Sequence, residues 1–375
     1  MPYTLLATGD LMLQRPIVRP DAPGMAEVWR AFAAADHVFA NLEVVLTRRG
    51  EASDKLVCLR ADPELADELA AAHVGIVSAA NNHALDYGLG GLTDTLAATR
   101  SAGVLPVGAG TRLDEALRPA LIQAEALTVG FLGLASTLPN GCGAAAERGG
   151  VAPVRVLSRF VVDPVTIDED PGMAPYVETV TLPGDQERAA QAVSEAKRQA
   201  DLLVVGVHWG VPHGWVAEFQ GELAGYQQPL AHALVDAGAD AVVGHHPHVL
   251  HGVEVYRGRP IFYSLGNFLF HSLLAGSPPV ERRYPPYSWE TLRGELNHYG
   301  GVARVTWEDP TAGPARVVLA PVWLDEAGEP AWADGTRAEV ALDRVEDLSR
   351  KFGTSFRRDG GGLEVLIGEH PQGDR

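Results

Sequence analysis

The chain has 375 residues, of which 46% are hydrophobic and 21% charged, so it can bury a sizeable core. Its formal net charge of −18 argues against partners that need a basic footprint, namely nucleic acids and anionic membrane surfaces. The two cysteines exclude a disulfide framework. No signal peptide is recognised and no apolar run reaches the ~18 residues of a membrane span, so we expect a cytoplasmic protein.

The predicted elements alternate between strands and helices. In chain order we expect a strand at 3–7, a helix at 26–35, a strand at 37–39, a helix at 62–72, a strand at 74–78 and a helix at 90–102. Residues 121–123 and 129–134 are predicted to pair, followed by a helix at 186–200, a strand at 202–207, a helix at 228–237 and a strand at 241–243. Strands at 302–307 and 315–324, a helix at 340–352 and a strand at 363–367 complete the chain.

Two long stretches lack regular periodicity. Residues 138–185 are rich in glycine, proline and acidic residues, and residues 272–299 carry four prolines among aromatic residues and arginines. Loops of this length inside a compact domain are typical of functional lids, so we expect them to lie over a substrate. We find no internal repeat and no linker, and we interpret residues 1–375 as one domain.

A polar cluster follows almost every predicted strand of the first 250 residues. The alternation of strand and helix favours a layered α/β fold, in which ligands bind beyond the carboxyl ends of the strands. The candidate functional residues at these ends are Asp10, Glu43, Asn82, His83, Asp86, His208, His246 and His248. Carboxylate, carboxamide and imidazole groups together indicate a divalent-metal site suited to manganese, zinc, iron or calcium, and we expect no organic cofactor.

Six motifs in order carry a resemblance to a known family. They are Thr8-Gly9-Asp10, Asn41-Leu42-Glu43, Asn81-Asn82-His83-Ala84-Leu85-Asp86-Tyr87-Gly88, Val207-His208-Trp209-Gly210, Gly244-His245-His246-Pro247-His248 and Tyr263-Ser264-Leu265-Gly266-Asn267-Phe268. Over residues 3–270 the chain resembles the CapA family, the poly-γ-glutamate capsule proteins of the calcineurin-like metallophosphoesterase superfamily. The resemblance implies a calcineurin-like four-layer αββα sandwich.

The resemblance also implies roles for individual residues. Asp10, Glu43, Asn82, His208, His246 and His248 would surround the metal, and His83 would be the acid/base residue, oriented by Asp86. The alternative for Asp86 is an N-cap of the following helix. For His245 a packing role is expected.

Two departures from the superfamily concern the metal ligands. Phosphoesterases usually begin with Asp-x-His, whereas the third position here is Met12, and their second aspartate is replaced by Glu43. The loss of an imidazole leaves one metal position short of a ligand. A pair of metals held about 3.5–4 Å apart, as phosphoester displacement requires, is therefore not guaranteed.

The reaction has three interpretations. The first is Cα epimerisation of a peptide, as in the soluble members that resemble lasso-peptide epimerases. One acid/base pair would be His83 with Asp86, and the other Asp10 with a second histidine, which could be His246, His248 or His298. The alternative is a metal-dependent hydrolase of a phosphoester or a γ-glutamyl amide bond. The third is a non-catalytic scaffold, which the intact His83 and Asp86 disfavour. The sequence favours the first and does not determine the oligomeric state.

A peptide substrate is predicted from aromatic and basic residues near the second loop. Trp209 and Tyr287 are candidates for an apolar wall, and Arg282 and Arg283 for binding a carboxylate, which arginine matches bidentately. The alternative is that the aromatic residues only fix the loops and the arginines are solvated.

Overall fold

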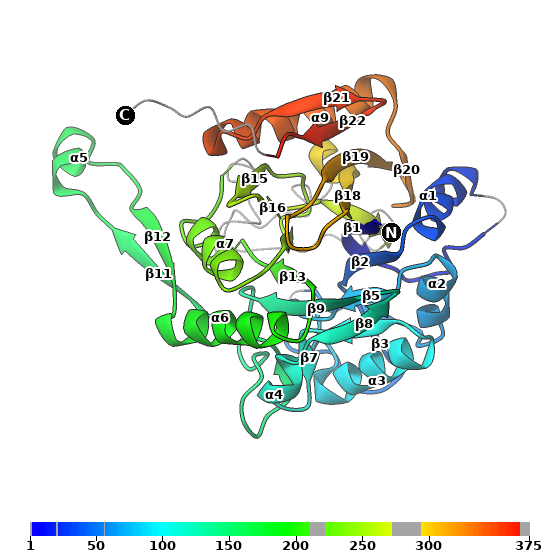
Figure 1. Cartoon of the computed structure of the whole chain (residues 1–375). Coiled ribbons are helices and arrows are strands. Elements are labelled where there is room, and N and C mark those ends of the chain that lie inside the picture. Colours follow the sequence, from blue (N-terminus) through cyan, green and yellow to red (C-terminus); the bar gives the residue numbers. More distant parts are fainter. Residues whose placement is uncertain (1, 20–21, 56, 211–221, 272–293, 368–375) are drawn as a thin grey trace.

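The computed structural model describes residues 2–19, 22–55, 57–210, 222–271 and 294–367, and it contains two large β-sheets (Figure 1). Sheet I has ten strands: β1 (Tyr3–Met12), β2 (His37–Leu42), β5 (Ile76–Ser78), β6 (Leu105–Val107), β17 (Asn267–Phe270), β18 (Tyr299–Trp307), β19 (Arg316–Leu324), β20 (Pro330–Trp332), β21 (Phe356–Asp359) and β22 (Gly362–Val365). Sheet II has six: β8 (Ala120–Ala124), β9 (Leu127–Ala135), β13 (Leu202–His208), β14 (Ala241–His245), β15 (Val253–Tyr256) and β16 (Arg259–Phe262).

Short strand pairs and helices complete the described structure. The pairs are β3 (Val45–Leu46) with β4 (Arg60–Ala61), β7 (Ala109–Gly110) with β10 (Gly150–Val151), and β11 (Val156–Val161) with β12 (Tyr176–Thr181). The α-helices are α1 (Pro23–Ala33), α2 (Leu65–Ala71), α3 (Gly88–Ser101), α4 (Leu113–Ala116), α5 (Pro164–Glu169), α6 (Pro183–Lys197), α7 (Gln227–Asp236) and α9 (Gly335–Ser349). Two 3₁₀ helices are η3 (Glu295–His298) and η4 (Arg350–Phe352).

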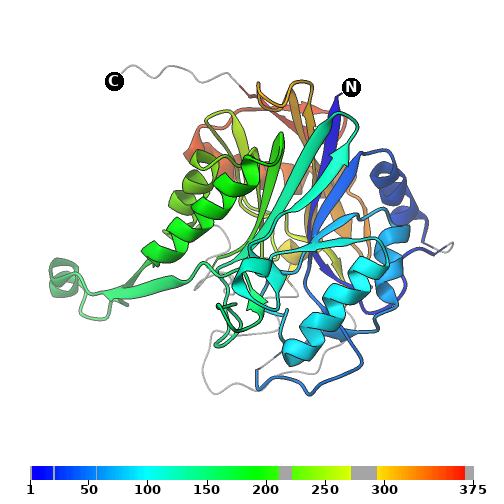
Figure 2. The ribbon, with the colours of Figure 1, turned by 60° about the horizontal axis from the view of Figure 1, so that its bottom comes forward.

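The two sheets pack face to face, and helices cover their outer faces (Figure 2). Alternation along single strands produces this layering, because successive side chains of a strand point to opposite faces. In β1, Leu5 enters the core between the sheets, whereas Leu6 packs under α1 and α2. In β13, Val204 enters the central core and Val205 packs under α6 and α7. The expected α/β class is therefore confirmed, with helices on both outer faces.

Parallel strands bring the carboxyl ends of both sheets to one edge. In sheet I, β1, β2, β5 and β6 run parallel, and in sheet II β9, β13, β14 and β16 do so. The register of β1 shifts between Asp10 and Leu11 where it pairs with β17, and such irregularities re-aim side chains next to sites. The edge where these strands end carries the polar clusters.

Most predicted elements are confirmed, with boundaries that shift by a few residues. The predicted hairpin is the antiparallel pair β8–β9, and the helices at 26–35, 90–102 and 186–200 correspond to α1, α3 and α6. Six strands of the two large sheets were not predicted, namely β6, β15, β16, β17, β20 and β21. Among the described residues, no helix combines the length and apolar composition needed to cross a membrane.

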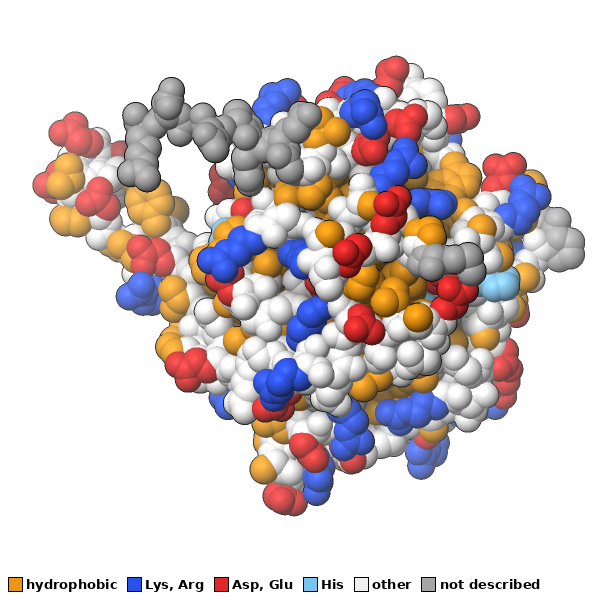
Figure 3. All heavy atoms as spheres, viewed as in Figure 1, with side chains coloured by type: hydrophobic (Ala, Val, Ile, Leu, Met, Phe, Trp, Pro, Cys, Tyr) orange, Lys and Arg blue, Asp and Glu red, His pale blue; other side chains and the backbone are white. Residues whose placement is uncertain are grey.

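The expectation of a structureless loop at 138–185 was wrong. This segment contains β10, β11, α5 and β12, and the β11–β12 hairpin with α5 projects from the body as an arm (Figures 1 and 2). Acidic and hydrophobic side chains cover the arm (Figure 3), including Phe160 and Val165, which are 74% and 72% exposed. An isolated two-stranded hairpin has no buried face, so the alternation that marks a strand in the sequence is missing here. Most of the second predicted loop, 272–293, lies outside the described residues.

Candidate metal centre

Buried polar side chains from the ends of four strands meet at the carboxyl edge of the two sheets. Asp10 lies on β1, Glu43 follows β2, and His208 is the last residue of β13. His246 and His248 follow β14. All five side chains are buried, and Asp10 and Glu43 have no exposed surface. Their convergence follows from the parallel strands, because each strand delivers its terminal residue to the same edge.

Two groups of potential metal ligands share Glu43. One group is Asp10, Glu43 and His248, and the other is Glu43, His208 and His246; within each group the donor atoms lie within 4.8 Å of one another. His248 Nδ1 lies 3.3 Å from Asp10 Oδ2, and His208 Nε2 lies 3.5 Å from Glu43 Oε1. A carboxylate common to two donor groups is the arrangement expected of a bridged two-metal site.

The atom at the centre of this arrangement is Glu43 Oε1. It is buried and accepts no hydrogen bond, yet Nε2 atoms of three imidazoles approach it: His208 at 3.5 Å, His248 at 3.9 Å and His83 at 4.0 Å. Buried polar atoms normally have a partner. A carboxylate oxygen surrounded by imidazole nitrogens at these separations has the surroundings of an atom that binds a cation.

Electrostatics also favour a bound cation. Burial, and then the charge of Asp10, raise the pKa of Glu43 well above its ordinary value. Burial lowers the pKa of His208 far below its usual range, with the neighbouring His246 adding to the effect, and lowers that of His246 to about 3. Neutral imidazole and carboxylate are the forms that bind metals. A divalent cation would compensate the charge of the buried carboxylates, so the residues present fit a metal.

Asn41 connects the donor groups through hydrogen bonds. Its Nδ2 lies 2.8 Å from Asp10 Oδ1, 3.3 Å from Glu43 Oε2 and 3.2 Å from His208 Nδ1. Its own Oδ1 accepts a hydrogen bond from Asn81 at 3.2 Å. No role was predicted for Asn41 from the sequence. The available signal was its spacing, since it precedes Glu43 by two residues and shares its strand face.

Asparagine side chains also position two of the histidines. Asn82, predicted as a ligand, has its Oδ1 2.8 Å from His208 Nε2. Asn267 Oδ1 on β17 lies 2.9 Å from His248 Nδ1, which leaves Nε2 of that ring toward Glu43. His246 and His248 both have positive φ, 99° and 57°, which is uncommon for residues other than glycine and is concentrated at functional sites.

His83 and Asp86 form a buried pair beside the donor groups. Asp86 Oδ2 lies 2.7 Å from His83 Nδ1 and accepts a hydrogen bond from the Leu59 amide at 2.6 Å. Helix α3 begins at Gly88 and its N-cap, Tyr87, makes no side-chain capping bond, so the alternative role of Asp86 as an N-cap is excluded. Burial lowers the pKa of His83 and outweighs the opposing effect of Asp86, which keeps the ring neutral near pH 7.

Lys55 completes this pair and was not predicted. Its ammonium group forms an ion pair with Asp86 Oδ1 and donates a hydrogen bond to the Asn82 carbonyl at 2.7 Å. Lys55 belongs to an irregular segment between β3 and β4, far from the other site residues in sequence. No local motif marks it, because only the folded chain brings it to Asp86.

Several predicted residues lie elsewhere in the structure. His298 was expected to pair with Asp10, but its Nδ1 bonds the Leu324 carbonyl at 2.8 Å and its ring stacks on Trp323. Trp209 was expected to line a substrate wall, but it is fully buried, stacks on Tyr263 and donates its indole N–H to the Tyr263 carbonyl. Both corrections have one cause: these rings fill apolar layers beside the site.

The remaining predictions concern packing and the second loop. His245 packs against Phe39 and bonds the Thr8 carbonyl through Nε2 at 3.1 Å. Met12, which stands where phosphoesterases have a histidine, belongs to the apolar core under α1. Arg282, Arg283 and Tyr287 lie outside the described residues.

The chain is similar to one described protein family and to several bacterial proteins. The family model described as "Bacterial capsule synthesis protein PGA_cap" matches residues 4–272. The PGA biosynthesis protein CapA of Bacillus subtilis is 34% identical over 270 residues, which cover 70% of this chain and 62% of that protein. A Mycobacterium tuberculosis protein named as a polyglutamine synthesis accessory protein is 36% identical, covering 85% of this chain and 74% of the relative.

A solved structure is also similar at low level. A hypothetical protein from Thermus thermophilus aligns with a TM-score of 0.44 and 17% identity, over 85% of this chain and 98% of that one. The family model covers most of the chain and includes all of the residues that the two donor groups contribute. The chain therefore belongs to the family of bacterial capsule synthesis proteins described by PGA_cap, as the six motifs had indicated.

Proposed function

We propose that this protein is a metal-dependent hydrolase that cleaves an amide bond of an acidic chain of the poly-γ-glutamate type. The observation that carries the proposal is the position of His83, whose Nε2 lies 4.0 Å from the carboxylate oxygen shared by the two donor groups. The names of the relatives, which refer to PGA biosynthesis and polyglutamine synthesis, support the substrate class. The layered sheets support a calcineurin-like αββα sandwich as the scaffold.

The donor groups define where reaction chemistry takes place. Asp10, Glu43 and His248 would hold one divalent ion, and Glu43, His208 and His246 a second, with Asn82 beside His208. Bound ions of this kind polarise a carbonyl or phosphoryl oxygen and lower the pKa of water. Asn41 holds the two carboxylates and His208 in one network, so the donor atoms are positioned before any ligand binds.

His83 is the group that moves the proton. Asp86 fixes the ring through Nδ1, which leaves Nε2 facing the shared carboxylate and the reacting atoms. The neutral ring accepts a proton at Nε2 from the attacking water and then returns it to the leaving amine. Asp86 stabilises the imidazolium that forms in between, and Lys55 holds Asp86 in place through their ion pair.

Hydrolysis accounts for the site better than Cα epimerisation. Epimerisation needs two acid/base groups, one on each face of the Cα atom. The site supplies the His83–Asp86 pair. Of the histidines considered for a second pair with Asp10, His298 is bonded to the Leu324 carbonyl, and His246 donates its backbone amide to Asp10. His248 Nδ1 does lie 3.3 Å from Asp10 Oδ2, but both residues belong to one metal-donor group, and as ligands of a bound ion they would not serve as an acid/base pair. The names of the relatives likewise refer to polymer synthesis and not to peptide epimerisation.

The proposal is tested with two substrates under matched conditions. Metal-loaded protein is incubated with γ-linked hexaglutamate and, separately, with bis(p-nitrophenyl) phosphate, with and without a chelator. We expect shorter oligoglutamates and a new amino terminus, lost on chelation. If only the phosphodiester is hydrolysed, the bond that this protein cleaves is a phosphoester and not an amide. No turnover of either substrate at full metal loading would contradict the proposal.

A further inference from the structure

A second cavity, of about 620 Å³, lies beside the metal centre and is lined by arginines. Arg148, Arg155 and Arg188 are the ionised groups among the described residues that form its wall, together with Asn140 and the loop around Gly141 and Gly143. A basic cavity is unexpected in a chain whose formal net charge is −18. The excess of positive charge is therefore local to this cavity.

The arginines are only partly neutralised. Buried Asp185 is bonded to Arg155 through both carboxylate oxygens, at 2.6 and 2.8 Å, and to Arg188 at 2.8 Å. Arg148 donates only to the Gly143 carbonyl in the described contacts, at 3.0 and 3.3 Å. Three guanidinium groups thus face one carboxylate, and the cavity retains positive charge. Because Asp185 holds Arg155 and Arg188 in place, these side chains are organised before any ligand binds.

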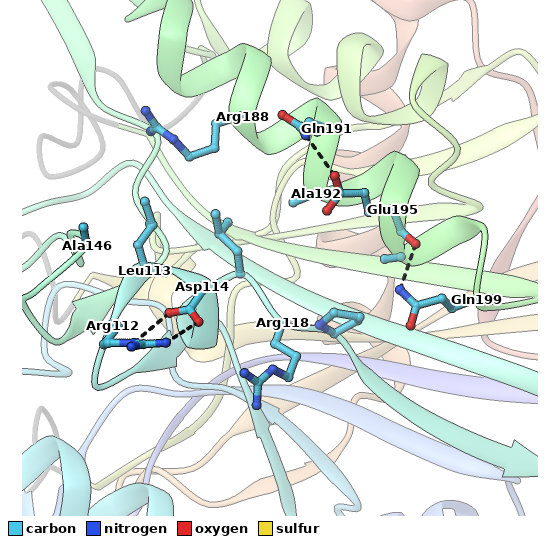
Figure 4. A pocket seen from close by; sticks show the side chains of 13 residues that line it. Arg112, Leu113, Asp114, Arg118, Ala146, Arg188, Gln191, Ala192, Glu195 and Gln199 are labelled. Carbon is cyan, nitrogen blue, oxygen red and sulfur yellow. Dashed lines mark hydrogen bonds and ion pairs between the residues drawn. The ribbon is translucent and has the colours of Figure 1, made fainter.

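The neighbouring cavity has a wall of mixed charge (Figure 4). It also measures about 620 Å³ and shares Leu113, Ala146 and Arg188 with the arginine-lined cavity. There, Arg112 is paired with Asp114 at 2.7 Å, and Glu195 is bonded to Gln191. Its wall thus carries two carboxylates beside three guanidinium groups, those of Arg112, Arg118 and Arg188, so an anion would gain less from it.

A short stretch of chain connects the arginine-lined cavity to the metal centre. Leu138, Pro139 and Asn140 form part of its wall, and the preceding Ser136 and Thr137 bond the carbonyl of His208. Three extended residues span at most about 11 Å, so Asn140 lies within roughly that distance of Thr137.

We propose that this cavity binds carboxylate groups of an acidic chain while a neighbouring unit of the same chain occupies the metal centre. Guanidinium groups match carboxylates bidentately, and arginine keeps its charge at any working pH. A chain that carries a carboxylate in every unit can contact the arginine-lined cavity and the metal centre at the same time, because only a few residues of this protein separate the two sites. The inference rests on the proposed function for the identity of the chain and adds a subsite that selects its charge.

The test measures binding and cleavage separately. Fluorescein-labelled γ-linked hexaglutamate is titrated into the metal-loaded His83→Ala protein, in which cleavage does not interfere, with α-linked hexaglutamine as the uncharged probe. We expect Arg148→Gln in this background to weaken hexaglutamate binding about fivefold and Arg148→Glu more than about tenfold, with Arg148→Lys retaining most of the affinity. The matched control is Arg30→Gln on α1. Arg30 is exposed, lies near Glu27, and its replacement removes the same positive charge away from the cavity lining.

The outcomes separate this inference from the proposed function. Equal binding of hexaglutamate and hexaglutamine, or equal losses in the Arg148 and Arg30 variants, would overturn the subsite. Arg148→Gln could also disturb the loop, because it loses the hydrogen bond to the Gly143 carbonyl. The binding measurement is therefore repeated with Arg188→Gln, which leaves that hydrogen bond in place. Binding that depends on Arg148 in a protein that cleaves neither substrate would uphold the subsite and contradict the hydrolase. If cleavage and binding of hexaglutamate are unchanged when Arg148 or Arg188 is replaced, the hydrolase is upheld and the subsite is contradicted.

Discussion

At the scale of single residues, the metal chemistry depends most on Glu43, whose carboxylate belongs to both donor groups. The neutral isostere Glu43→Gln keeps the shape of the side chain and removes its charge. We expect the wild-type protein to bind about two metal ions per chain and Glu43→Gln to bind none. His246→Ala, which affects only one donor group, should retain about one. Metal content measured by mass spectrometry on dialysed protein checks this. Equal loss in both variants would contradict a shared ligand.

Asn41 should influence the metals without binding them. Replacing Asn41 by alanine removes the hydrogen bonds to Asp10 and Glu43. Changes to groups that orient ligands typically cost about 10- to 100-fold in metal affinity or activity, and we expect a loss in that range. Titration with a metal chelator of known affinity measures it, and Asn41→Asp, which keeps an oxygen but not the N–H donor, serves as the control. Unchanged affinity in Asn41→Ala would show that the network is dispensable.

His83 should affect catalysis and not metal content. No donor group contains His83, so His83→Ala should keep its metals and lose activity by about 10²- to 10⁴-fold, the usual contribution of a positioned acid/base group. Turnover of γ-linked hexaglutamate and metal analysis are made on the same preparation. Activity near the wild-type level would remove His83 from the mechanism, and a matching loss of metal would make it a ligand.

At the scale of elements, close backbone contacts fix the strand ends that carry the site. A Cβ atom at Gly9 would lie 1.9 Å from the Gly266 carbonyl oxygen, which also accepts the Asp10 amide hydrogen bond at 3.0 Å. The approach of β1 to this turn therefore sets the position of Asp10. Only a residue without a side chain allows it.

Gly9→Ala should accordingly reduce both stability and metal binding. Overpacking of this kind costs typically about 1–3 kcal/mol of unfolding free energy. Gly90→Ala in α3 is the matched control, because nothing lies within 4 Å of its added Cβ, and a helical glycine gains about 0.5–1 kcal/mol on replacement by alanine. Urea unfolding of both variants measures the difference. Equal stability of the two would show that β1 can move away from Gly266.

The same scale shows which parts of the structure the sequence predicts. Asp10, Glu43 and His208 were predicted because they stand directly after apolar runs, and parallel strands must bring such ends together. Lys55, which pairs with Asp86, could not be predicted, because its segment has no periodicity and its contact exists only in the folded chain. His298 and Trp209 were misassigned because an aromatic residue near a motif packs in a core as readily as it faces a ligand.

At the scale of the whole molecule, buried histidines outside the site make stability depend on pH. Burial, and then the positive charges of neighbouring basic residues, hold the pKa of His251 and of His271 at about 3 in the folded protein. In the unfolded chain a histidine titrates near 6.5, so below that pH the unfolded state binds more protons. Stability is therefore complete above pH 6.5 and falls as the pH decreases from 6.5 toward 3.

The pH effect can be isolated with His251→Gln. For each such histidine the unfolding free energy decreases by about 1.4 kcal/mol for every pH unit below 6.5, or by roughly 2 kcal/mol between pH 6.5 and 5. We expect the loss of stability between pH 7.5 and 5, measured by urea unfolding, to be smaller in the variant by about this amount. The substitution His73→Gln, at an exposed position in the loop after α2, is the control. An unchanged pH dependence in His251→Gln would contradict a neutral buried His251.

Isotope incorporation from water distinguishes hydrolysis of the amide bond from epimerisation, because hydrolysis adds oxygen from water and epimerisation adds hydrogen. Metal-loaded protein is incubated with γ-linked hexaglutamate in H₂¹⁸O and D₂O, and the products are analysed by mass spectrometry and by chiral amino-acid analysis. Hydrolysis predicts shorter chains with one ¹⁸O in each new carboxylate and with unchanged configuration at Cα. These products should not form with the His83→Ala protein. An intact chain that has gained deuterium at an inverted Cα would contradict hydrolysis and establish epimerisation.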